Sequence, residues 1–362
     1  NQKRNDTMEK DTQEMESDEL QKTGRKKRRK KKILIIVIVI AAVLLALLGI
    51  AYAVIHHYYA KSNYVQDGDV AVVTESELPQ DVQEENSVDS MSEEARREAE
   101  EKALAAQKDV EFPNGDYVYN LLLIGSDRRD TSWYGNSDVM MLASINSKTK
   151  TIYLTSFMRD SYAIVGDTGA HKLNYAYALG GGPLLTETIE NNYRINIDNY
   201  ASADFTSTAQ IVDLVGGVDI DLYQEECDYL TEQGVGDFPS AGTYHLNGEQ
   251  AVAYGRIRYV GYYDYERTER QRRVMEQIFL KAKSLSLSEL NTLANEILPL
   301  TTHNLSESEV ISLVTQLPSI ISYDLELGRV PYDGMFHSEG ELLVPDWEAT
   351  IAQLHATIYA EE

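Results

Sequence analysis

One long apolar run precedes a region in which shorter apolar runs alternate with polar segments. Residues 33–55 carry no charge and consist mainly of Ile, Val, Leu and Ala, and about 20 such residues are enough for a helix that crosses a bilayer. A basic block lies at 25–32, directly before this run. Because basic flanks stay on the cytoplasmic side, we predict a cytoplasmic basic tail at 1–32, one transmembrane helix at 33–55 and an extracellular remainder. The chain would then be a single-pass protein of the cell membrane.

The segment at 56–111 reads as an extracellular linker and stalk. Its first part is polar and acidic with scattered valines, which is typical of a loose connection. Ser92, or Ser90 with Glu93, is a helix cap, and the residues from Glu94 to Lys108 have helical spacing. We expect this charged helix to hold a domain at 112–362 away from the membrane, with partner binding as the alternative.

From residue 112 onward, strand patterns alternate with helical patterns. Val118–Ile124, Val139–Ile145 and Thr151–Phe157 are rich in strand formers. Further elements are expected in chain order: a helix from Pro183 to Asn192, a helix over Thr206–Val215, a strand over Val218–Leu222, and helices over Leu285–Ile297, Ser306–Leu317 and Asp346–Tyr359. Such alternation predicts one layered α/β domain.

Composition excludes several functional classes. The formal charge is -25, and Cys227 is the single cysteine, so neither an internal disulfide nor a cysteine-based zinc site is expected. Cys227 is expected to be a buried apolar residue. The sequence has no Walker loop, no Gly-x-Ser-x-Gly elbow and no zinc-protease histidine spacing. The basic block lies against the predicted membrane helix, which argues against nucleic-acid binding.

Six arginines lie between Arg256 and Arg273 in this acidic chain. A helix capped by Asn247, with Gln250 at its third position, is expected to end near Gly255. Arg256 and Arg258 then fall on an irregular segment. An acidic protein repels anions at long range, so the cluster requires either carboxylate partners or a phosphorylated ligand, and both remain open.

A second helix is expected from about Asp264. Arg267, Arg270 and Gln271 share the face of its apolar residues, because spacings of three, four and seven return to one side of a helix. They are expected to point inward, whereas Arg272 and Arg273 are expected to face solvent. Buried guanidinium groups need carboxylates or a bound anion, and their planar forks match phosphate oxygens.

Further candidates follow or precede predicted strands. Asp127 follows the first strand and Asp138 precedes the second, so that together they are candidates for Mg²⁺ binding, with turn and capping roles as the alternative. Arg159 follows the third strand, where it faces either the same crevice or a surface ion-pair partner such as Asp160. Lys172 follows a glycine-containing loop and is a weaker cation candidate.

Several blocks in order give the chain a resemblance to the LytR-CpsA-Psr family of bacterial cell-envelope proteins. The blocks are Asn120–Asp127, Ser137–Leu142, Met158–Asp160, Lys172–Ala178, Val212-Asp213 with Gly216–Val218, Leu246–Ala251, Arg256–Arg258 and Arg267–Gln271. The resemblance implies a three-layer α/β/α sandwich with a central mixed sheet and a deep apolar pocket for a lipid tail. It also implies Mg²⁺-dependent transfer of a glycopolymer, such as teichoic acid or capsular polysaccharide, from polyprenyl pyrophosphate to a peptidoglycan hydroxyl.

The same resemblance assigns roles by position. Asp127 and Asp138 would be metal-linked acids, one of which helps to deprotonate the acceptor hydroxyl. The pyrophosphate would be surrounded by Arg159, Lys172, Arg256, Arg258, Arg267, Arg270 and Gln271. A polyprenyl-pyrophosphate hydrolase and a non-catalytic scaffold that binds lipid-linked glycan are the alternative functions.

Three positions depart from the family pattern. Asn136 stands where arginine is common, Phe157-Met158 replaces Ile-Pro, and Glu266 replaces glycine. Loss of the cation at position 136 would weaken or reshape the phosphate contacts, unless Arg128 or Arg129 supplies that charge.

Overall fold

The computed structural model describes residues 52–361 apart from 54–55, 58, 129–132, 259 and 261–263. The predicted tail at 1–32 and all but Tyr52 and Ala53 of the predicted membrane helix at 33–55 lie outside the described residues. Among the residues that are described, no helix is both long enough and apolar enough to cross a membrane.

A mixed sheet lies at the centre of the described part. It has seven strands in the order β1-β10-β7-β2-β3-β4-β11, in which β7 is parallel to β2, β3 is antiparallel to both β2 and β4, and β11 is parallel to β4. The strand bounds are Asn63–Tyr64, Thr302–His303, Asn199–Asp204, Val118–Ser126, Ser137–Asn146, Thr151–Phe157 and Asp324–Val330 in that order. The predicted mixed α/β architecture with a central mixed sheet is confirmed.

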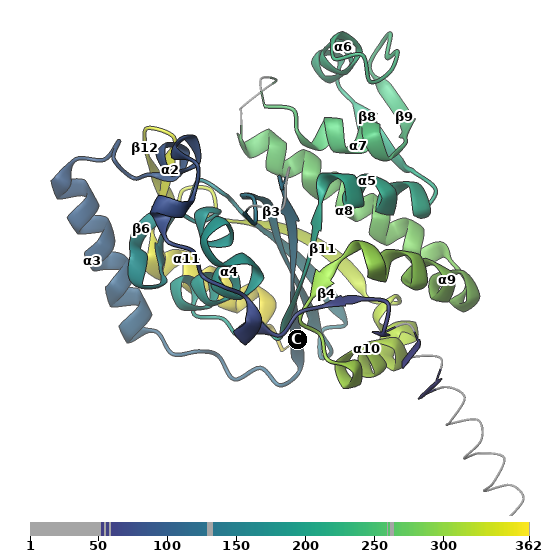
Figure 1. Cartoon of the computed structure of the whole chain (residues 1–362), viewed down its shortest axis with the longest axis horizontal. Helices are drawn as coiled ribbons and strands as arrows, with labels where there is room; N and C mark the ends of the chain where they lie inside the picture. Colours follow the sequence, from purple (N-terminus) through teal and green to yellow (C-terminus); the bar gives the residue numbers. More distant parts are fainter. Residues whose placement is uncertain are drawn as a thin grey trace, which may run out of the picture. The chain divides into compact units, whose positions relative to one another are not determined.

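Helices cover both faces of this sheet (Figure 1). One face carries α3 (Glu93–Asp109), α4 (Tyr175–Tyr193) and α11 (Trp347–Ile358), and the other carries α5 (Phe205–Leu214), α8 (Asp264–Ser284) and α9 (Leu287–Ile297). Every second residue of β2 is buried, which matches the alternation of side chains along a strand. All residues of β4 are buried. The remaining elements are α2 (Gln80–Asn86), β5 (Tyr162–Val165), β6 (Gly169–Lys172), α10 (Glu307–Ile320), β12 (Phe336–Glu339) and β13 (Leu342–Pro345).

The described residues from 59 to 111 belong to the same compact unit as the sheet, which extends from Tyr58 to Glu362. This differs from the predicted linker and stalk at 56–111. The helix capped by Ser92 is present as α3, but its buried face packs into the main core. That face consists of Ala99, Ala103 and Ala106, which give little hydrophobic signal in the sequence.

A second hydrophobic core lies beside the arginine-rich segment. It is built by α5, α6 (Gln224–Glu232), α7 (Gly248–Gly255), α8 and the hairpin of β8 (Val218–Leu222) and β9 (Gly242–Leu246). Cys227 is buried in this core, as predicted. The predicted strand β8 exists, but it pairs with β9 rather than with the central sheet. Asn247 and Gln250 form the predicted capping box at the start of α7, and Arg256 directly follows the end of this helix.

Candidate functional site

Strand pairing brings distant parts of the chain together at one edge of the sheet. Ser126 at the end of β2 pairs with Ser137 at the start of β3, and β4 runs antiparallel to β3 and ends at this same edge. Asp127, Asp138 and Arg159 therefore lie at one edge of the sheet, as the sequence predicts for strand ends. Charged side chains from α8 and from the segment after α7 reach the same place.

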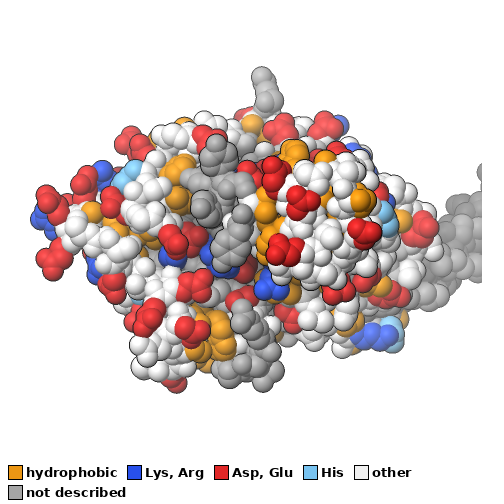
Figure 2. All heavy atoms as spheres, turned by 90° about the horizontal axis from the view of Figure 1, so that it is seen from above, with side chains coloured by type: hydrophobic (Ala, Val, Ile, Leu, Met, Phe, Trp, Pro, Cys, Tyr) orange, Lys and Arg blue, Asp and Glu red, His pale blue; other side chains and the backbone are white. Residues whose placement is uncertain are grey.

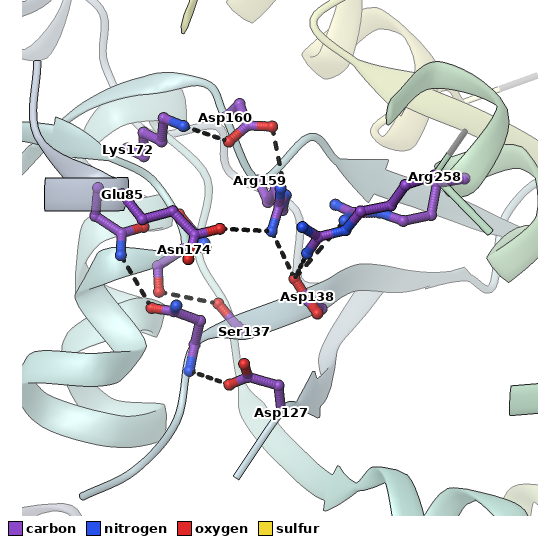
Figure 3. A network of polar contacts seen from close by, with 12 residues as sticks. Glu85, Asp127, Ser137, Asp138, Arg159, Asp160, Lys172, Asn174 and Arg258 are labelled. Carbon is purple, nitrogen blue, oxygen red and sulfur yellow. Dashed lines mark hydrogen bonds and ion pairs between the residues drawn. The ribbon is translucent and has the colours of Figure 1, made fainter. Parts of the chain in front are cut away.

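Asp138 is the centre of the polar network in Figure 3. Its Oδ1 atom lies 3.0 Å from Arg159 Nη1, 3.8 Å from Arg258 Nη2 and 3.9 Å from Arg267 Nη1. The first of these distances is a hydrogen bond and the other two are longer than one. Three guanidinium groups thus surround one carboxylate, which leaves positive charge facing the centre.

These charges change the proton affinity of the Asp138 carboxyl. Burial alone would raise its pKa, but the positive charges of Arg267, Arg159 and Arg258 outweigh burial, and the pKa lies below its usual range. Asp138 is therefore ionised at neutral pH. A carboxylate held in this way binds cations well and accepts protons poorly.

Asp160 connects Arg159 to Lys172. Its Oδ2 atom lies 3.3 Å from Arg159 Nε, and its Oδ1 atom lies 3.0 Å from Lys172 Nζ. Lys172 is buried and also lies 3.8 Å from the exposed Glu341. Lys172 thus joins the network through Asp160, which sequence reasoning offered as an ion-pair partner of Arg159 but did not connect with Lys172.

Asp127 holds the turn before β3. Its Oδ1 atom accepts a hydrogen bond of 2.6 Å from the Asn136 backbone N–H, and its own N–H donates to the Asn136 carbonyl. The buried side chain of Asn136 accepts a hydrogen bond from Asn86 Nδ2 at 3.3 Å. The missing arginine at position 136 is thus replaced by an amide pair with α2. Arg128 is exposed, and Arg129 lies outside the described residues.

The two aspartates agree in donor type with the predicted Mg²⁺. Among the described residues, no group of three or more His, Cys, Asp and Glu side chains could hold a metal ion. Mg²⁺ is commonly held through one or two carboxylates, with substrate phosphates completing its coordination. Asp127 and Asp138 have the carboxylate oxygens that this mode requires.

Three other predicted phosphate ligands lie elsewhere. Arg270 is almost fully buried, donates to Glu226 at 2.6 Å and to Glu266 at 2.9 Å, and also bonds to the carbonyls of Ile257 and Val260. Arg256 is exposed and its guanidinium lies 4.6 Å from the centre of the Phe205 ring. Gln271 donates to the Gly255 carbonyl at 3.3 Å. The inward direction predicted for Arg270 and Gln271 is confirmed, and their role as ligands stays a prediction.

The prediction that Arg272 faces solvent is wrong. Its side chain is 9% exposed, pairs with Glu269 and donates to the Gly328 carbonyl on β11 at 2.8 Å. Because the sheet edge covers a second face of α8, the helix buries more than its apolar stripe. Arg273 is partly exposed, and its guanidinium lies over the Tyr223 ring and hydrogen-bonds to Tyr254.

An apolar cavity of about 350 Å³ lies between the sheet and helices α5, α7, α8 and α9. It is lined mainly by aliphatic side chains and by Phe205, with Arg256 and Gln271 among its few polar residues. Gly125 and Val139 also line it, and they neighbour Ser126 and Asp138 in the chain. The cavity therefore adjoins the arginine cluster, and the apolar pocket that the resemblance implies is present.

Glu85 is a further residue of the network, and sequence reasoning missed it. It lies on α2, and its Oε1 atom is 3.5 Å from Arg159 Nη1. The polar sequence of α2 has the composition of a solvated segment, so no local signal marks Glu85.

Figure 2 shows many acidic side chains on one face of the molecule, with several basic side chains near the middle of that face.

Comparison with known proteins gives consistent matches. The LytR_cpsA_psr family model matches residues 81–353. The "Polyisoprenyl-teichoic acid--peptidoglycan teichoic acid transferase TagU" of Enterococcus faecalis is 34% identical over 226 residues, which cover 61% of this chain and 70% of that protein.

Solved structures agree with these matches. Protein gbs0355 from Streptococcus agalactiae has a TM-score of 0.58 at 26% identity, covering 71% of this chain and 90% of its own. The "LytR-CPS2A-psr family protein YwtF (TagT) with bound octaprenyl pyrophosphate lipid" has a TM-score of 0.51 at 25% identity, covering 69% and 93%.

Proposed function

Because the chain belongs to the LytR_cpsA_psr family, we propose that it transfers a glycopolymer from a polyprenyl-pyrophosphate carrier to peptidoglycan. Teichoic acid and capsular or secondary wall polysaccharides are the candidate polymers. The observation that carries the proposal is the convergence of Arg159, Arg258 and Arg267 on Asp138 beside an apolar cavity. A similar protein named as a teichoic acid transferase and a similar structure with a bound prenyl pyrophosphate support it.

The arginine cluster suits a pyrophosphate. Three guanidinium groups converge on Asp138, and guanidinium forks match phosphate oxygens. In phosphoryl transfer, most catalysis comes from positioning and from stabilising negative charge. Arg159, Arg258 and Arg267 would hold the donor phosphates while the acceptor oxygen approaches, and Lys172 would act beside them through Asp160.

The apolar cavity suits the prenyl tail. Burial of apolar surface contributes about 25 cal/mol per Å², so a tail in this cavity would add affinity that the phosphates alone do not supply. Arg256 and Gln271 line the cavity, where they would contact the donor near the junction of tail and phosphate. Arg270 would support the neighbouring backbone through its bonds to Ile257 and Val260.

Asp127 and Asp138 would hold Mg²⁺ in this reaction. When bound, the ion supplies positive charge against the phosphate oxygens. The chain's own contribution is the placement of the two carboxylates at adjoining strand ends. The predicted membrane helix at 33–55 would keep the domain on the extracellular side, close to lipid-linked donors.

This function can be tested with purified protein, lipid-linked donors, Mg²⁺ and peptidoglycan. We expect glycopolymer attached to peptidoglycan, with release of prenyl phosphate. Arg258→Ala should lower transfer about 10²-fold or more, whereas Arg273→Ala, which changes an arginine that is not one of the three around Asp138, should not. Release of the polymer without attachment would indicate a hydrolase, and donor binding without turnover would indicate a scaffold; either result would contradict transfer.

A further inference from the structure

Glu85 is the only carboxylate of the described network that comes from α2. Its Oε1 atom lies 3.5 Å from Arg159 Nη1, the same nitrogen that donates to Asp138. Figure 3 shows Glu85 reaching Arg159 from the α2 side, while Asp138 reaches it from β3. A phosphate held by Arg159 would therefore have Glu85 as a neighbour.

The placement of Glu85 is fixed by its helix. Val82 of α2 is buried in the main core, and Asn86 is fully buried with its amide nitrogen 2.7 Å from the Val82 carbonyl. The same amide reaches Asn136, which joins α2 to the turn that carries Asp138. Glu85 is thus carried by a segment that is packed on one side and hydrogen-bonded to the site on the other.

The other carboxylates near Arg159 already serve other groups. Asp138 faces three guanidinium groups, with Arg159 Nη1 at 3.0 Å, Arg258 Nη2 at 3.8 Å and Arg267 Nη1 at 3.9 Å. Asp160 holds both Arg159 and Lys172, with its side chain 9% exposed. Asp127 accepts from the backbone of Asn136 at 2.6 Å. The side chain of Glu85 is 44% exposed and meets Arg159 at a longer distance, so it can meet an incoming acceptor.

We propose that Glu85 is the general base that takes the proton from the acceptor hydroxyl. This inference rests on the proposed transfer function and adds a residue to it. It differs from the expectation that Asp127 or Asp138 serves as the base. Besides the Mg²⁺ proposed for both aspartates, Asp138 contacts the arginines and Asp127 holds the turn before β3.

The proposed step transfers the glycan-bearing phosphate of a pyrophosphate donor to the acceptor hydroxyl. The acceptor oxygen forms a bond to the phosphorus that carries the glycan, and its proton passes to the Glu85 carboxylate. The bridging bond from that phosphorus to the lipid phosphate breaks, and the electron pair leaves with the lipid phosphate. Because Glu85 is partly exposed, it returns the proton to solvent before the next turnover.

Glu341 is the competing exposed carboxylate. It lies between β12 and β13, and its side chain is 92% exposed. Its Oε2 atom is 3.8 Å from Lys172, which itself reaches Arg159 only through Asp160. Glu85 contacts the central arginine directly, and the geometry therefore favours Glu85.

The test uses Glu85→Gln in the full chain. Glutamine keeps the size of the side chain and an oxygen that faces Arg159, but it cannot take a proton, so the variant separates proton transfer from positioning. Glu84→Gln is the matched control, because Glu84 is the adjacent exposed carboxylate on α2 and bonds to Gln80. We expect Glu85→Gln to lower turnover about 10²–10⁴-fold with unchanged affinity for the lipid-linked donor, and Glu84→Gln to leave both unchanged.

Two further measurements complete the test. Glu85→Ala should regain part of its turnover when formate is added, because a small carboxylate can occupy the vacated position. A Glu85→Gln variant with nearly normal turnover would overturn the proposal, as would an equal loss of donor affinity or a loss confined to Glu341→Gln. Absence of transfer by the unmodified chain would instead overturn the proposed function, and the role of Glu85 would fall with it.

Discussion

Arg267 and Arg270 lie one helical turn apart on α8, and both are almost fully buried, yet they have different environments. Arg270 Nε lies 2.6 Å from Glu226, whose side chain is 2% exposed, and its other nitrogens bond to Glu266 and to two carbonyls. Arg267 lies 3.9 Å from Asp138, which two other arginines share. Burial of an arginine therefore does not reveal its role. The contacts distinguish the two: Arg270 bonds directly to Glu226, whereas Arg267 faces a carboxylate that two other arginines also approach.

The largest effect is expected when methionine replaces Arg270. Arg270→Met removes the partner of the buried Glu226, and breaking a buried ion pair costs about 3–5 kcal/mol. Urea unfolding should show this loss in the free energy of unfolding. The double variant Glu226→Leu/Arg270→Met should recover most of it, since no buried charge remains; a double variant as unstable as Arg270→Met would show that the pair is not the cause.

The same substitution at Arg267 should act on transfer. Arg267→Met keeps similar volume, and Asp138 retains Arg159 and Arg258 as partners. Transfer should fall about 10²–10³-fold, the usual cost of removing one group that stabilises transition-state charge. The free energy of unfolding should fall by less than in Arg270→Met, because Asp138 keeps two arginine partners. If Arg267→Met unfolds like Arg270→Met and still transfers normally, the two arginines do not differ as described.

The sequence predicted the central strands well because their apolar residues follow the sheet's periodicity. It missed β7, whose sequence Asn-Tyr-Ala-Ser-Ala-Asp has few large apolar residues, although it pairs with β2 at the centre of the sheet. It also placed β8 without its true partner, since pairing depends on contacts that are distant in the sequence. Local patterns specify an element, whereas its neighbours are set by the packing of the whole domain.

The site likewise combines residues that the sequence identified with residues that only the packing of the domain reveals. The resemblance selected Asp138, Arg159, Arg258 and Arg267, and the structure brings these four together. Helical phase and the resemblance both grouped Arg270 with Arg267, because no local feature marks Glu226 as a partner on α6. Glu85 escaped notice for a related reason: its polar helix reads as linker, and only the burial of Val82 and Asn86 places it beside Arg159.

A smaller effect is expected in the apolar cavity, where contacts with the prenyl tail can be tested separately from the charges of the arginines. Ala203→Phe would fill part of the cavity from β7. Donors with long prenyl tails should lose about tenfold or more in affinity, because apolar area can no longer be buried. Pyrophosphates with a short tail should bind as before, since the arginines are unchanged. Equal losses for long and short donors would show that the cavity does not hold the tail.

The smallest effect concerns Asp138, the carboxylate that Arg267 approaches together with Arg159 and Arg258. The pKa of Asp138 is lowered in the folded protein, so its ionised form stabilises the fold above the ordinary aspartate pKa of about 3.9. This contribution is lost as the pH falls from there through the lower pKa of the folded state. Asp138→Asn should therefore be less stable than the unmodified protein at pH 6, and the difference should shrink below about pH 4. Urea unfolding across this range measures it, and a difference that stays constant down to pH 3 would show that the three arginines do not act on Asp138 as their distances indicate.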